Sequence, residues 1–140
     1  AQHAAEAVEQ RHDYAQAVFG GQLHAVAYAL AVVGDVVVRE HNALGEAGVP
    51  YLIPETEEQD ALMRVIYDGV KAGKGPDAYR ADLLTVVEHM MARGASVFLL
   101  GCTELPLAAE AVGLTVPVVD PTAELAKAAI RFCGFRVRAK

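Results

Sequence analysis

The sequence predicts an α/β domain: a parallel sheet with helices packed on both of its faces. Short apolar runs alternate with longer segments whose apolar residues recur at helical spacing, which is the pattern of that fold class. A hydrophobic content of 54% excludes a disordered chain, and much of it is alanine, which favours helices packed closely on a sheet. A chain of 140 residues has the length of one domain and can bury about two-thirds of its unfolded surface.

The first part of the chain predicts helix, strand, helix and strand in turn. Apolar residues at helical spacing predict a helix over 4–19, before the pair of glycines that follows it. The run "AVAYALAVV" over 25–33 predicts a strand buried on both faces. A helix is expected over 37–48, and "VPYLIP" predicts a short strand after it.

The second part is more strongly patterned. Two helices are expected to face the core with apolar stripes, Leu62, Ile66 and Val70 in one and Tyr79, Leu83, Val87 and Met90 in the next. The runs "SVFLL" and "VPVVD" predict strands, with a short helix through "CTELPLAAEA" between them. A last helix is expected to begin at Asp120-Pro121, capped by Asp120, and to bury Leu125, Ala129, Ile130 and Cys133.

Charge and residue counts exclude several classes of protein. The net charge is −6 and there is no basic stripe, so we expect no nucleic-acid partner. No apolar run reaches the roughly 18 to 20 residues of a membrane helix, and we expect a soluble, cytoplasmic protein without a membrane partner. Two distant cysteines and scattered histidines predict neither a disulfide framework nor a metal site. The acids of "PETEEQD" are expected to form a solvated helix start.

The stretch "GCTELPL" stands where a buried strand ends and a helix begins. Gly101 allows another group to approach the backbone, and the following amides lie at a helix start, which suits a carboxylate or phosphate. The same positive helix end is expected to lower the pKa of the Cys102 thiol. Thr103 adds a hydroxyl group and Glu104 a proton acceptor, so an anion cradle and an acid/base group fall within four residues.

Simpler interpretations of both cysteines stand beside this one. Free cysteine is among the most buried residue types, so Cys102 can be read as a packing residue. The position of Cys102 after a strand and before Thr-Glu favours a functional role instead. Cys133 shares an apolar stripe of the last helix and is expected to lie in the core. Ser96 is the single serine and lies inside a predicted strand, which disfavours serine hydrolase chemistry.

"GCTELPL" resembles the second cysteine motif of the aspartate/glutamate/hydantoin racemase superfamily, and its Glu after Cys-Thr resembles the aspartate racemase branch. "VPVVDPTAELAKAAIRF" is similar to the closing strand and helix of those enzymes. The resemblance is clearest over residues 34–132, and it implies that residues 1–140 form one flavodoxin-like or Rossmann-like domain, the C-terminal half of such an enzyme.

The resemblance implies a racemase that interconverts the D and L forms of a small acidic amino acid, such as aspartate, without pyridoxal phosphate or metal. Cys102 would be an acid/base at the substrate's Cα, Glu104 its proton relay, and Gly101 and Thr103 part of the substrate cradle. The expected ligand is an amino acid or dicarboxylate. Protonation on the face opposite deprotonation needs a second acid, which the first domain's cysteine supplies in these enzymes.

This chain departs from the family in lacking the first domain's cysteine motif. We therefore expect association with a first racemase domain or with another copy of the chain, because the domain-facing surface would otherwise be bare. A second hypothesis is a non-catalytic domain that keeps the fold and an anion pocket. A third stays within the superfamily, as a relative of hydantoin racemase or maleate isomerase, the latter using cysteine as a nucleophile.

Overall fold

The structure is a computed structural model, and it describes residues 26–29 and 44–138. The helix expected over 4–19 lies outside the described residues, as does most of the segment expected to form a helix over 37–48. Residues 44–46 are helical, and the chain turns at Gly48, whose φ of 66° lies in the left-handed region.

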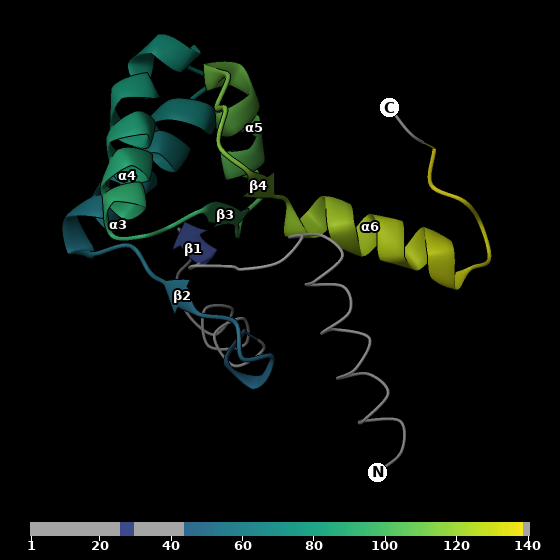
Figure 1. The fold of residues 1–140 in the computed structure, drawn as a ribbon. Helices are drawn as coiled ribbons and strands as arrows, with labels where there is room; N and C mark the ends of the chain where they lie inside the picture. Colours follow the sequence, from purple (N-terminus) through teal and green to yellow (C-terminus); the bar gives the residue numbers. More distant parts are fainter. Residues whose placement is uncertain (1–25, 30–43, 139–140) are drawn as a thin grey trace.

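A four-stranded parallel sheet forms the centre of the fold (Figure 1). Its strands are β1 (Val26–Ala29), β2 (Tyr51–Leu52), β3 (Val97–Leu100) and β4 (Val118–Val119), in the order β2-β1-β3-β4. Val26 pairs with Tyr51 on one side and with Val97 on the other, and Phe98 pairs with Val118. Because all strands are parallel, their carboxyl ends meet at one edge, where such sheets bind ligands.

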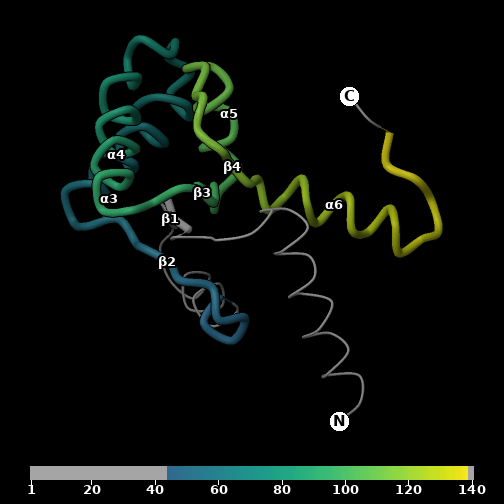
Figure 2. Tube along the Cα trace, in the orientation of Figure 1, coloured from purple at the N-terminus to yellow at the C-terminus, as the bar shows by residue number. Residues whose placement is uncertain are grey.

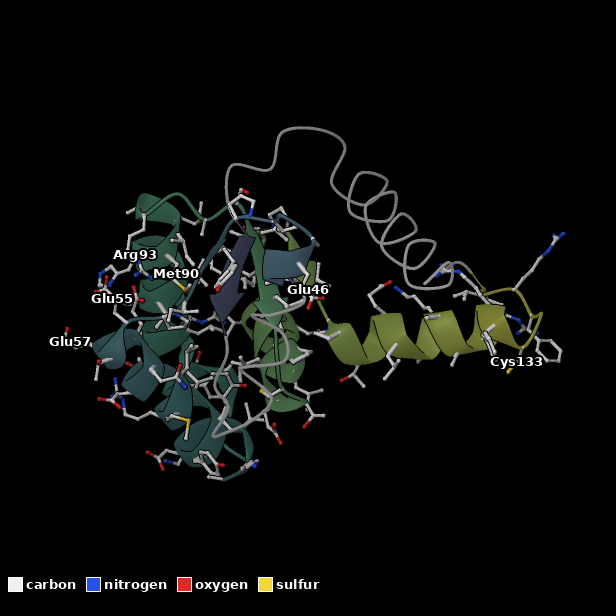
Figure 3. The ribbon with its side chains drawn as sticks, turned by 90° about the horizontal axis from the view of Figure 1, so that it is seen from below. Glu46, Glu55, Glu57, Met90, Arg93 and Cys133 are labelled. Carbon is white, nitrogen blue, oxygen red and sulfur yellow. The ribbon has the colours of Figure 1, made fainter. Side chains whose placement is uncertain are left out.

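Helices connect the strands and cover the sheet. The β2–β3 connection contains α3 (Thr56–Met63), η1 (Arg64–Val70), η2 (Pro76–Ala78) and α4 (Arg80–Ala92), and the β3–β4 connection contains α5 (Glu104–Val112). Both connections step across the sheet in the same direction, so right-handed crossovers place α3, α4 and α5 on one face, as Figures 1 and 3 show. The predicted fold class, a parallel sheet flanked by helices, is confirmed.

The core lies between these helices and β3. Leu62, Ile66, Leu83 and Met90 are buried, as their helical spacing predicts, and they pack with Phe98 of β3. The helix expected around Ile66 departs from α geometry, because η1 is a π-helix in which the N–H of Lys71 donates to the Ile66 carbonyl at 2.8 Å. The chain turns in the "KAGKGP" segment after η1, with Gly73 at a φ of 69°.

The last helix, α6 (Pro121–Phe132), begins as predicted but does not bury its apolar face. The Asp120 carboxylate accepts the N–H groups of Thr122 at 2.9 Å and Ala123 at 3.2 Å, which confirms the cap. The helix then extends away from the sheet (Figures 1 and 2). Leu125 is 72% exposed, and Ala129, Ile130 and Cys133 are exposed with it, so the expectation that this stripe lies in the core is wrong. The spacing correctly indicates an amphipathic helix, but it does not say what the apolar face contacts.

Within the described ranges, no helix combines the length and the apolar character that a membrane span requires.

Candidate functional site

The "GCTELPL" motif lies at the carboxyl edge of the sheet. β3 ends at Leu100, Cys102 follows two residues later, and α5 begins at Glu104. The buried residues Leu100 and Leu105 fix the two ends of this turn in the core. Asp120 follows β4, the neighbour of β3, so it belongs to the same edge. The sequence therefore places the motif at the edge where ligands of parallel sheets bind.

The Cys102 thiol is half-buried at the start of α5. The backbone N–H of Leu105, the second residue of α5, donates to its Sγ at 3.3 Å. Part of the side chain packs against the hydrophobic core. The thiol is thus held by a helix amide on one side and by apolar groups on another, while part of it remains open to solvent.

The Glu104 carboxylate is the centre of a small polar cluster beside the thiol. Its Oε2 accepts the hydroxyl of Thr103 at 3.0 Å, and its Oε1 lies 3.7 Å from the ammonium of Lys71. Burial alone would raise the pKa of Glu104, but the Thr103 hydrogen bond and the Lys71 charge outweigh it and lower the pKa. Glu104 is therefore ionised at neutral pH.

The pKa of the Cys102 thiol is raised, contrary to the expectation of a lowered value. Burial is the largest cause, because it disfavours the thiolate. The backbone hydrogen bonds at the start of α5 lower the pKa, as the helix argument predicts, but they do not compensate for burial. The charge of Glu104, and a hydrogen bond between it and the thiol, raise the pKa further. The resting group is a thiol beside a carboxylate that can accept its proton.

The sequence did not predict two residues that lie beside the motif: Tyr67 in η1, and Lys71 directly after it. Lys71 pairs with Glu104, and its ammonium lies 4.5 Å from the centroid of the Tyr67 ring. They precede the cysteine motif by a whole helix and a strand, so spacing along the chain gives no signal of the contact. α5 packs against η1, and this contact brings Tyr67 and Lys71 to the motif. The structure thus adds a cation to the predicted set of Gly101, Cys102, Thr103 and Glu104, in which Gly101 is half-buried and Thr103 exposed.

Cys133 is not part of this arrangement. It lies at the far end of α6 from the sheet, as Figure 3 shows. Its exposed thiol corrects the expectation that it is a core residue. Among the described residues, no group of three or more His, Cys, Asp or Glu side chains has the geometry to hold a metal ion.

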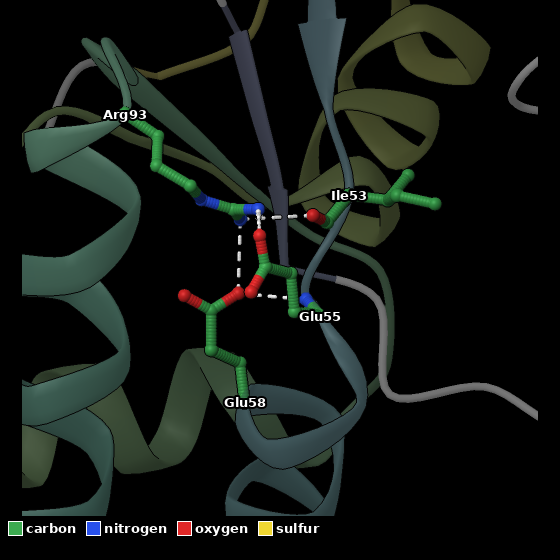
Figure 4. Close-up of polar contacts among 4 residues, drawn as sticks. All are labelled: Ile53, Glu55, Glu58 and Arg93. Atoms are coloured by element: carbon green, nitrogen blue, oxygen red, sulfur yellow. Dashed lines mark hydrogen bonds and ion pairs between the residues drawn. The ribbon is translucent and has the colours of Figure 1, made fainter.

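A second polar cluster joins the start of α3 to the end of α4 (Figure 4). The Arg93 guanidinium donates to Glu55 Oε1, Glu58 Oε2 and the Ile53 carbonyl, each at 2.9 Å, and the Glu55 N–H donates to Glu58 Oε2 at 2.7 Å. Glu58 is only 6% exposed, so the expectation of a solvated helix start is wrong for this residue. Every contact here has a structural explanation: the cluster caps α3 and ties it to α4.

A surface hollow of about 250 Å³ lies beside this second cluster, between α3 and α4. Glu57, Arg64, Asp82 and His89 are among its lining residues, and the "GCTELPL" residues are not. Arg64 pairs with the Asp82 carboxylate in its wall, and Arg93 pairs with the carboxylates of Glu55 and Glu58. The hollow is therefore separate from the site at the carboxyl edge.

The sequence profile of the Asp/Glu/hydantoin racemase family matches residues 25–129, which is most of the chain. This chain belongs to that family. The match includes the cysteine motif, Lys71 and the first turns of α6.

The fold agrees with the family. The crystal structure of a Yersinia pestis protein assigned as an Asp/Glu racemase is similar to this chain, with a TM-score of 0.64 and 24% sequence identity. The similarity covers 79% of this chain and 48% of that one. This chain therefore spans about half the length of that relative, and the likeness shows the shared fold.

Proposed function

We propose that this chain is the Cys102-bearing half of a cofactor-independent amino-acid racemase that acts on a small acidic amino acid such as aspartate. Family membership supports the reaction class. The observation that carries the proposal is the thiol itself: it is partly accessible, bonded by a helix amide, and adjacent to an ionised carboxylate.

In the proposed reaction, Cys102 exchanges a proton with the substrate's Cα. As thiolate it removes the proton, and the electrons of the broken C–H bond move towards the substrate carboxylate. Glu104 accepts the thiol proton when the base is prepared and returns it afterwards. The amides at the start of α5 suit the growing negative charge on the substrate carboxylate, since a helix N-terminus stabilises anions.

The cation beside the motif favours an acidic substrate. The Lys71 side chain is 45% exposed, so its ammonium can face a ligand as well as Glu104. A substrate with a second carboxylate gains from this charge, whereas a hydantoin ring carries no such group. Lys71 supports an acidic substrate over a hydantoin. Maleate also carries two carboxylates, so the preference for the aspartate branch over a maleate isomerase depends on the Glu of "GCTELPL" alone.

The second acid is proposed to come from another α/β unit that covers α6. The helix exposes Leu125, Ile130 and Phe132, and Phe135 beyond its end is also exposed. Since α6 starts at the same sheet edge as Cys102, a unit that packs on it would stand near the thiol. The Yersinia pestis relative, about twice as long, has room for such a unit. We propose that a first racemase domain or a second copy of the chain supplies it.

Interconversion of D- and L-aspartate and of D- and L-glutamate, by the chain supplied with a first racemase domain, tests this function. Cys102→Ser is expected to abolish any activity found, while Cys133→Ser, which changes an exposed thiol at the far end of α6, leaves it unchanged. Undiminished activity of Cys102→Ser contradicts the assignment.

A second candidate is a non-catalytic module that binds small dicarboxylates. The raised pKa of Cys102 favours it, because a thiol that stays protonated is a poor base. Calorimetric titration with succinate and aspartate separates the two. Binding without exchange of the Cα proton, by a chain whose first domain has been supplied, supports the module.

A further inference from the structure

The η1 segment presents a side chain to the cysteine motif through an unusual backbone. The N–H of Lys71 donates to the Ile66 carbonyl at 2.8 Å, with the spacing of a π-helix. Such segments occur often at functional positions. Ile66 and Gly69 are buried, so the inner side of η1 is fixed against the core.

The outer side of η1 carries Tyr67 and then Lys71. Tyr67 is 50% exposed, so its ring lies at the surface. The Lys71 ammonium lies 4.5 Å from its ring centroid, within the range of a cation–π contact. A lysine side chain is flexible, and the ring restricts the positions that this ammonium occupies.

The restricted position is the one beside the motif. From above the ring, the same ammonium lies 3.7 Å from Glu104 Oε1, while Thr103 binds the other carboxylate oxygen at 3.0 Å. Among the described residues, Glu104 is the charged group that acts on the Cys102 thiol, and Lys71 is the cation that offsets it.

We propose that Tyr67 is a positioning residue, which holds the Lys71 ammonium against Glu104 and so limits the negative charge that the Cys102 thiolate meets. Tyr67 acts only through Lys71. The proposal deepens the proposed function, since it concerns the same thiol, but it can be tested without turnover. Removing the ring frees the ammonium, leaves Glu104 less neutralised, and makes the thiolate harder to form.

The test uses the 140-residue chain with Cys133→Ser and measures by mass spectrometry how fast iodoacetamide alkylates Cys102 at each pH. Tyr67→Leu is expected to slow alkylation at pH 8 by about twofold to fivefold and to shift the profile to higher pH. Tyr67→Phe keeps the ring face and is expected to match the parent. Lys71→Met is expected to slow alkylation at least as much as Tyr67→Leu.

A double variant separates positioning from a general structural role. Adding Tyr67→Leu to Lys71→Met is expected to cause no further slowing, because the ring then has no ammonium to hold. Arg64→Met removes a cation from the start of η1 that pairs with Asp82 instead, and it serves as the matched control. If Tyr67→Leu does not fold, Tyr67→Met, which also lacks a ring, replaces it.

Three outcomes overturn the proposal: an unchanged profile in Tyr67→Leu, slowing by Tyr67→Phe equal to that by Tyr67→Leu, or additive effects of Tyr67→Leu and Lys71→Met. Exchange of the Cα proton of aspartate in D₂O is measured separately. Lack of that exchange together with the expected alkylation shifts contradicts the proposed function and leaves the positioning role intact.

Discussion

The backbone N–H of Leu105, the second residue of α5, donates to the Sγ of Cys102 at 3.3 Å, so a helix amide contacts the sulfur. This contact opposes the effect of burial on the thiol. A helix amide stabilises the thiolate, whereas the apolar surroundings stabilise the thiol, and burial is the larger effect. The pKa of Cys102 therefore depends on its surroundings, and a bound ligand or a domain that covers the thiol would change it.

The pH dependence of stability reports the raised pKa of Cys102. Because the folded pKa lies above the unfolded one, the thiol contributes stability that is complete below about pH 8.5 and is lost as the pH rises through the folded value. Urea unfolding is expected to show a steeper loss of stability above pH 8.5 for the Cys133→Ser protein than for the same protein with Cys102→Ser added. Equal slopes contradict the raised pKa.

Arg93→Met is expected to lower the free energy of unfolding by about 2–3 kcal/mol. The substitution leaves the buried Glu58 carboxylate without its cation, although the Glu55 N–H still donates to it. Arg64→Met is the control: Arg64 also binds a carboxylate through two nitrogens, but the pair is exposed and solvent screens it, so a much smaller loss than that of Arg93→Met is expected. Urea denaturation of both variants measures the difference, and similar losses would show that Glu58 does not depend on Arg93.

Gly69→Ala is expected to destabilise the protein although alanine is the better helix former. A Cβ at Gly69 would lie 2.6 Å from Cδ1 of the buried Tyr79 ring. Overpacking of this kind costs about 1–3 kcal/mol, against a gain of about 1 kcal/mol in helix propensity.

Gly75→Ala is the matched control for this change, since a Cβ there meets nothing within 4 Å and its φ of −69° suits any residue. The control is expected to be neutral or slightly stabilising in thermal unfolding. A Gly69→Ala protein as stable as the control would mean that η1 is not packed tightly on Tyr79.

Because the apolar face of α6 is exposed, we expect it to bind a second copy of the chain or a first racemase domain. Replacing Leu125 and Ile130 by Lys together is expected to reduce any self-association without unfolding the domain, because both side chains are exposed. Sedimentation over a concentration series measures this. A chain that stays monomeric, and whose association with a first racemase domain is unaffected by the substitutions, contradicts the role given to α6.

Much of the fold follows from local pattern. Alternating strands and helices, the stripe of Leu62 and Ile66, and the turn that carries Cys102 all lie within single elements or between neighbours, where periodicity is informative. The Asp120 cap is equally local. These predictions are confirmed by the described structure.

What the sequence did not reveal depends on contacts between distant segments. Glu58 is buried because Arg93 reaches it from another helix, and Lys71 meets Glu104 because α5 packs on η1. The exposure of Leu125 depends on what covers α6, which an amphipathic pattern cannot identify. The net pKa of Cys102 likewise depends on burial, which outweighs the helix amide that the sequence does predict.

The most direct test of the acid/base role of Cys102 is exchange of the Cα proton in D₂O. Incubated with L-aspartate, the chain alone is expected to incorporate deuterium with the L configuration retained, since it carries one of the two acids that inversion needs. Nuclear magnetic resonance and chiral chromatography measure incorporation and configuration. We expect Cys102→Ser to abolish incorporation and Cys133→Ser to leave it unchanged. Incorporation at the same rate in Cys102→Ser would contradict the account.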